Sequence, residues 1–159
     1  MEPSNYKDMF RLYLANNEIE NAKSLLKTIT TGSYREVGLY YHILNEIRFK
    51  ATSIEPFDWQ YFLKLVTEKV SKDDLKKFLS DIHNSIDYNE KLRSSYEGIS
   101  ISILKSKMEN SNFVKELQDL ILRQENMIEM NKRSLNILYD MKKYIDELKR
   151  SDPIRFDYY

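Results

Sequence analysis

The stretch YLANNEIENAKSLLKTI, residues 13–29, holds the pattern from which the fold is predicted. One apolar helical face ends at Leu14, the polar pair Asn16 and Asn17 follows, and a second apolar stripe begins at Ile19. Apolar residues that recur every three or four positions favour an amphipathic helix, and asparagine favours a turn. The stretch therefore predicts two helices joined by a tight corner.

The same pattern continues through the 159 residues and predicts an all-α protein. Only three glycines and three prolines are present, although sheets need many turns and turns usually need these residues. Periodicity and capping residues predict about seven helices, over residues 3–15, 18–30, 34–50, 56–70, 71–86, 89–108 and 112–150. Pro56 is expected in the first turn of its helix, and Ser71 is expected to cap the next one.

Three parts of the chain are expected from this division. Residues 1–110 would form a compact helical domain, either a repeat-like array or an ordinary bundle. Residues 111–150 would form one long helix that packs on this domain or self-associates. Residues 151–159 carry aromatic side chains after Pro153, which disordered tails usually lack, so this tail is expected to dock on the protein.

The first two predicted helices resemble a tetratricopeptide-repeat hairpin over residues 6–50. Large or small side chains stand where that family has them at Tyr6, Tyr13, Ala22, Leu26 and, one 34-residue unit after Tyr6, at Tyr40. The sequence departs from the family at the positions of Phe10, Tyr34, Leu44 and Pro56. The resemblance implies a concave protein-binding surface lined by the first helix of each pair, at Asn5, Arg11, Tyr41 and Asn45. An ordinary corner of a helical bundle is the alternative.

The long C-terminal helix carries a heptad pattern that is typical of a coiled-coil seam. Its seam positions are Val114, Leu117, Ile121, Gln124, Ile128, Asn131, Leu135 and Leu138, after which the register shifts to Met141, Ile145 and Leu148. We expect Gln124, Ile128, Asn131 and Leu135 to bind a partner helix, in a homodimer or in a complex with another protein. Further apolar residues widen the stripe, so a central strut within the chain's own bundle is the alternative reading. Met127, Met130 and Met141 would suit an adaptable binding face.

Two weaker patterns point to other functions. Arg35 and His42 have the Arg-x6-His spacing that distantly resembles the motif of HEPN-type ribonucleases, which would imply phosphate binding and acid–base chemistry there. The alternative is a small polar network that includes Glu46. Residues 56–86 could form a DNA-binding helix-turn-helix, with lysines at 64, 69, 72, 76 and 77, although acidic residues interleave with them.

The composition argues against most kinds of catalytic, metal-binding and nucleic-acid-binding site. Twenty-five basic residues balance twenty-five acidic ones, so no net charge would attract nucleic acid or anionic lipid. The absence of cysteine excludes disulfides and thiolate metal sites, and no histidine pair has metal-ligand spacing. No phosphate-binding glycine loop, signal peptide or membrane span is expected, and no cofactor. We therefore expect a cytoplasmic, non-enzymatic regulator or adaptor that binds another protein.

Overall fold

The computed structural model describes residues 6–32, 38–53, 55–97, 105–107 and 114–151. All regular structure within these residues is helical, which confirms the predicted all-α class. The helices are α1 (Tyr6–Ala15), α2 (Ile19–Thr31), α3 (Leu39–Ala51), α4 (Trp59–Thr67), α5 (Lys72–Glu97) and α7 (Val114–Ser151), and residues 105–107 form a helical turn. The expected long C-terminal helix is confirmed, because α7 runs without a break for 38 residues.

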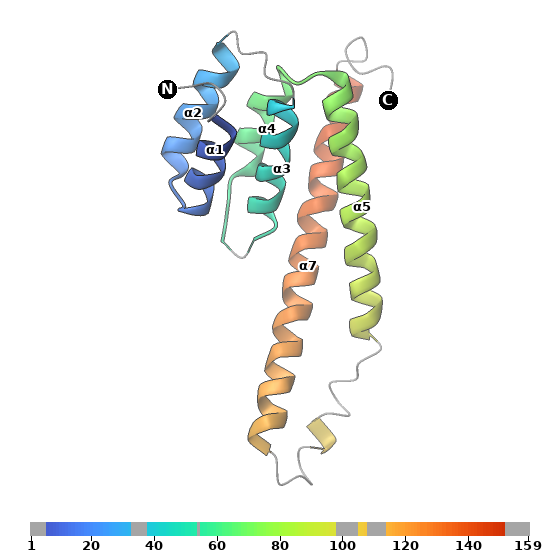
Figure 1. Cartoon of the computed structure of the whole chain (residues 1–159). Helices are drawn as coiled ribbons and strands as arrows, with labels where there is room; N and C mark the ends of the chain where they lie inside the picture. Colours follow the sequence, from blue (N-terminus) through green and yellow to red (C-terminus); the bar gives the residue numbers. More distant parts are fainter. Residues whose placement is uncertain (1–5, 33–37, 54, 98–104, 108–113, 152–159) are drawn as a thin grey trace.

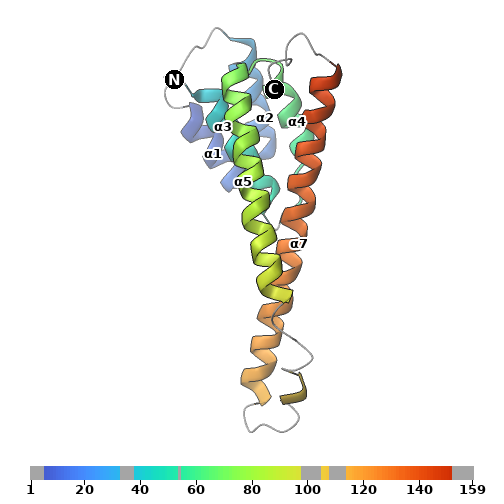
Figure 2. The same cartoon turned by 90° about the vertical axis from the view of Figure 1, so that its right-hand side faces the viewer.

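The four short helices form a bundle at one end of a long helical hairpin (Figure 1). We call α1 to α4 the head. Helices α5 and α7 lie side by side and antiparallel in both views, and they extend well beyond the head (Figure 2). We call this extension, residues 90–97 of α5 and 114–132 of α7, the arm. The molecule therefore has a four-helix head packed beside the upper half of a two-helix hairpin.

One apolar core joins the head to the hairpin. Within the head, Phe10 of α1 meets Phe62 of α4 edge to face, with ring centroids 6.0 Å apart. Trp59 of α4 meets Tyr144 of α7 in the same way, again at 6.0 Å. Leu135, Leu138, Met141 and Ile145 of α7 belong to the same buried cluster as the head residues. The C-terminal half of α7 is thus part of the head's core.

The corner between α1 and α2 has the form that the two asparagines predict. Asn17 adopts the left-handed conformation, with φ of 57°. The Glu18 amide donates a hydrogen bond to the Tyr13 carbonyl at 2.7 Å, and the Asn17 amide donates to the Leu14 carbonyl at 3.1 Å. These two bonds define a Schellman cap, which uses the otherwise unpaired carbonyls of the last turn. A single residue pair therefore turns the chain from α1 into α2.

Two predicted helix starts are wrong. The third helix was expected from Tyr34, but it begins at Leu39, because Gly38 has φ of +79° and stands at the N-cap. The fourth helix was expected to contain Pro56, but it begins at Trp59, and Pro56 lies in the connection before it. For α4, the apolar Phe57 upstream of the true start extended the helical pattern beyond the helix, whereas for α3 the predicted residues 34–37 lie outside the described residues.

The predicted break between the fifth and sixth helices is also wrong as far as the structure describes them. Helix α5 continues through Asp87 and Tyr88 to Glu97, since no glycine or proline interrupts it. Its predicted start is confirmed, because the hydroxyl of Ser71 accepts a hydrogen bond from the Asp74 amide at 3.1 Å. The predicted helical residues 98–104, the opening Pro3 and the aromatic tail from residue 152 lie outside the described residues.

Candidate functional site

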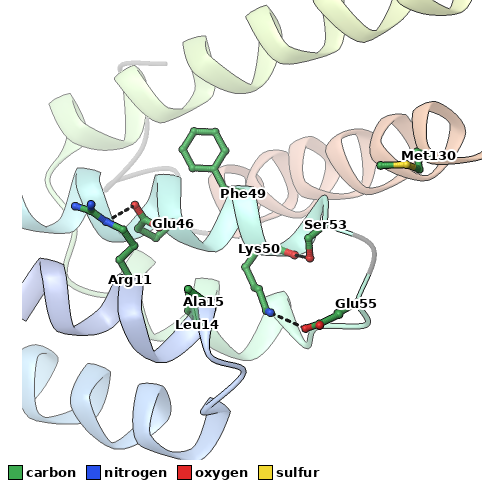
Figure 3. Close-up of a pocket in the computed structure, with 9 residues that line it drawn as sticks. All are labelled: Arg11, Leu14, Ala15, Glu46, Phe49, Lys50, Ser53, Glu55 and Met130. Carbon is green, nitrogen blue, oxygen red and sulfur yellow. Dashed lines mark hydrogen bonds and ion pairs between the residues drawn. The ribbon is translucent and has the colours of Figure 1, made fainter. Parts of the chain in front are cut away.

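A cavity of about 550 Å³ lies where the head meets the arm (Figure 3). Helices α1 and α3, the connection that follows α3, and α7 each contribute to its walls. The lining residues are Arg11, Leu14, Ala15, Glu46, Phe49, Lys50, Ser53, Glu55 and Met130. Residues that are far apart in the sequence thus form one concave surface.

Two large apolar side chains border this cavity from different helices. Phe49 of α3 is 57% exposed and Met130 of α7 is 48% exposed. Both belong to the small group of large hydrophobic side chains that the fold leaves in water. Exposed apolar side chains that gather around a hollow are typical of interaction sites, whereas single scattered ones are not.

A second hollow, of about 220 Å³, continues the surface along the arm. It shares Met130 with the first cavity, and its other lining residues are Asn89, Leu92, Tyr96, Met127, Asn131 and Ser134. Met127 is 44% exposed. We call the two hollows together the head–arm groove. Its apolar part is rich in methionine, whose flexible side chain can adapt to differently shaped partners.

The charged residues of the head–arm groove are paired with one another. Arg11 contacts Asp8 at 3.1 Å and Glu46 at 3.4 Å. Lys50, which is largely buried, pairs with Glu55 at 2.9 Å. The rim near the head is therefore close to neutral, and a ligand would be held there by apolar contacts more than by net charge.

The polar network expected around His42 is present, but its arginine is a different one. His42 lies 3.5 Å from Glu46 on the same helix and 3.4 Å from Arg11 of α1. Arg35, the partner that the ribonuclease resemblance requires, lies outside the described residues. The described geometry around His42 is thus a contact between α1 and α3 at the edge of the groove.

Of the four predicted groove residues, the structure places Arg11 in the cavity and Tyr41 and Asn45 elsewhere, and Asn5 lies outside the described residues. The Tyr41 hydroxyl donates a hydrogen bond to Asp81 of α5. Asn45 accepts one from Arg48 at 3.0 Å, and Arg48 also binds Ser85 of α5. This face of α3 is therefore covered by α5.

The same contacts shift two pKa values. The hydrogen bond to Asp81, and then burial, raise the pKa of Tyr41 above its ordinary value of 10. Burial lowers the pKa of Arg48 from its ordinary value, although Asp81 opposes that change. The polar cluster between α3 and α5 is thus a structural contact of the head with the hairpin.

The predicted seam of α7 faces α5 of the same chain. Leu135 is buried in the common core, and Ile128 is partly buried. Asn131 is buried and donates to the Asn89 carbonyl of α5 at 2.9 Å, so its amide holds the register of the hairpin. Gln124 lies one heptad earlier, and its buried Oε1 has no hydrogen-bond partner among the described residues. Of the two readings of this helix, the described contacts agree with the strut inside its own bundle.

The lysines of the proposed helix-turn-helix lie on the surface. Lys64, Lys69, Lys72, Lys76 and Lys77 are all exposed, and the amine of Lys77 lies 5.9 Å from the centre of the Tyr41 ring. Among the described residues, no group of acidic or histidine side chains is arranged to hold a metal ion. No helix in the described ranges is both long and apolar enough to cross a membrane.

Phe49 and Met130 are the functional candidates that sequence reasoning did not assign to a common site. The pattern placed Phe49 within the predicted helix of residues 34–50 and Met130 on a methionine-rich face of the last helix. The pattern could not predict that these two residues line the same cavity. Residues 49 and 130 are brought together only by the packing of α7 beside the head (Figure 3). Comparison of the chain with protein families, with curated proteins and with solved structures finds no match in any of the three.

Proposed function

We propose that this protein is a non-enzymatic interaction module, a regulator or adaptor that binds another protein in the head–arm groove. The observation that carries the proposal is the pair of exposed apolar side chains, Phe49 and Met130, on two sides of a cavity of about 550 Å³. Burying such side chains in a partner would be favourable, because apolar surface is transferred out of water.

The arrangement of the helices in the head also supports the proposal. Helices α1 and α2 form one antiparallel pair and α3 and α4 form the next, with α1 beside α3 and α2 beside α4 (Figure 1). Stacked helical pairs of this kind present a binding surface along their first helices. Arg11 on α1 and Glu46 on α3 both lie at the groove. A cytoplasmic site of action fits the absence of cysteine.

The proposal is tested by affinity capture with three baits from nuclease-treated lysate, read by quantitative mass spectrometry. The baits are the wild-type protein, Phe49→Glu and Leu12→Glu. Leu12 is the matched control, because it is an equally exposed apolar residue of the head, at 58%, and does not line the groove.

We expect at least one protein to be retained by the wild type and by Leu12→Glu, and to be depleted about tenfold or more with Phe49→Glu. Circular dichroism of the three baits would verify that each is folded. If the captured proteins are the same for all three baits, or if only the bait is recovered, the head–arm groove is not a protein-binding site.

A further inference from the structure

One ring nitrogen of His42 faces a hydrogen-bond donor and a hydrogen-bond acceptor at the same time. Its Nε2 lies 3.4 Å from the Nη2 of Arg11 on α1 and 3.5 Å from a carboxylate oxygen of Glu46 on α3. A guanidinium can only donate hydrogen bonds, and an ionised carboxylate can only accept them. The protonation state of Nε2 therefore decides which of these two neighbours it can bind.

A neutral ring with its lone pair on Nε2 binds Arg11. The same arginine pairs with Asp8 of its own helix at 3.1 Å and, through Nε, with Glu46 at 3.4 Å (Figure 3). The Glu46 side chain is only 16% exposed, so water satisfies little of its carboxylate and a cationic partner is favourable. In this state the guanidinium of Arg11 joins α1 to two residues of α3.

A protonated ring binds Glu46 instead. Histidine is the side chain that ordinarily changes its charge between about pH 5 and pH 8. With a proton on Nε2, His42 donates to Glu46, which lies one turn along the same helix. The ring then carries a positive charge, which repels the guanidinium of Arg11. Glu46 gains a cationic partner from its own helix, and Arg11 loses its acceptor on His42.

The other charged groups of the packed elements lie around this pair. On α1, Lys7 stands one turn before Arg11, and Asp8 binds Arg11. Helix α5 packs on another side of α3, where Asp81 accepts a hydrogen bond from Tyr41 and the amine of Lys77 lies 5.9 Å from the Tyr41 ring. The two charged contacts described for the ring of His42 are therefore those with Arg11 and Glu46.

We infer that His42 is a pH-dependent switch in the contact between α1 and α3. When the ring is neutral, Arg11 is bound to α3, and when the ring is protonated, Glu46 exchanges Arg11 for His42. The released Arg11 keeps Asp8 of its own helix as its partner. Because Arg11 and Glu46 both line the cavity of about 550 Å³, the exchange moves a positive charge within the wall of the head–arm groove. The inference goes beyond the proposed function, since the switch operates in the protein without a partner.

NMR spectroscopy of the full-length protein between about pH 5 and pH 8 tests the inference. The ring signals of both histidines and the Nε–Hε signals of the arginines are followed in the wild type and in His42→Gln. We expect the Arg11 signal of the wild type to move with the same midpoint as the His42 ring. In His42→Gln the Arg11 signal should stay constant, because glutamine does not change its charge.

Removal of either partner should shift the protonation of His42 in opposite directions. Glu46→Gln removes a carboxylate that favours the charged ring, so the midpoint of His42 should move to lower pH. Arg11→Gln removes a cation that opposes the charged ring, so the midpoint should move to higher pH. We expect each change to alter the proton-binding constant of His42 about twofold to fivefold. His83, which is exposed on α5, is the internal control, and its midpoint should be the same in every protein.

Two results would overturn the inference: an Arg11 signal that does not follow the His42 ring in the wild type, or a His42 midpoint that neither partner variant changes. Circular dichroism verifies that each variant is folded, and the wild-type titration decides the first point even if a variant is not. Failure of the switch is distinguishable from failure of the proposed function. If Phe49-dependent capture persists without the switch, only the proposed function holds, and if the switch is found without capture, only the switch holds.

Discussion

At the scale of single residues, the contact between Tyr41 and Asp81 ties the head to the hairpin. Its hydrogen bond raises the pKa of Tyr41, so the neutral phenol is favoured in the folded protein relative to the unfolded one. The stabilisation is therefore fully present below the unfolded pKa of about 10 and is lost as the pH rises through the higher pKa of the folded protein.

We expect Tyr41→Phe to lower the free energy of unfolding by about 1 kcal/mol at neutral pH, because one hydrogen bond to a carboxylate is lost. The difference from the wild type should shrink above about pH 10. Urea denaturation between pH 7 and pH 11 measures both effects. Tyr139→Phe is the control, since the Tyr139 hydroxyl also donates to a carboxylate, that of Glu90 at 2.7 Å, but on the surface. A constant difference between Tyr41→Phe and the wild type across this range would contradict the assignment.

Individual residues also show how far the candidate site could be predicted from the sequence. The heptad spacing correctly predicted that Asn131 and Leu135 are buried, because periodicity identifies the face of a helix that is covered. It could not identify what covers them, and α5 of the same chain does so in the described structure. Tyr41 was expected in an open groove, but α5 lies over that face of α3.

At the scale of elements, the corner between α1 and α2 depends on one backbone conformation. Asn17 has φ of 57°, which glycine adopts without strain, asparagine tolerates and alanine disfavours. We expect Asn17→Gly to raise the free energy of unfolding by about 0.5 kcal/mol and Asn17→Ala to lower it by about 1 kcal/mol. Thermal and urea denaturation measure the two changes. Asn16→Ala, at the neighbouring position without positive φ, should have little effect, and equal effects at both positions would show that the conformation is unimportant.

Helix boundaries were predicted well where a specific residue sets them. Ser71 caps α5 and Asn17 ends α1, and both were evident from side-chain chemistry. The start of α3 was missed, because Gly38 adopts a left-handed conformation and the apolar pattern before it suggested a longer helix. Amphipathic periodicity reports which residues face the core, but it does not report whether the backbone between them is helical.

At the scale of the whole molecule, the head and α7 depend on each other. Leu135, Leu138, Met141 and Ile145 lie in one cluster with the core of the head. A fragment of residues 1–110 would expose the surface that these side chains cover, and small bundles with incomplete cores are marginally stable. We expect this fragment to lack a cooperative thermal transition, and Met141→Ala in the full chain to lower the free energy of unfolding by about 2–5 kcal/mol.

Circular dichroism and calorimetry of the fragment measure the first effect, and urea denaturation of the variant measures the second. Leu122→Ala is the control, because Leu122 lies on the same helix but is 56% exposed in the arm. A fragment that unfolds cooperatively at the temperature of the full chain would show that residues 1–110 form an independent domain.

The place of Met141 and Ile145 in the chain has a consequence for biosynthesis. These two side chains belong to the buried core, yet the ribosome adds them after the residues of the other helices that the structure describes. The head is translated early, but its core is closed only by residues translated late. The core of the head is therefore complete only after Met141 and Ile145 have left the ribosome, and until then the nascent head exposes the apolar surface that α7 later covers.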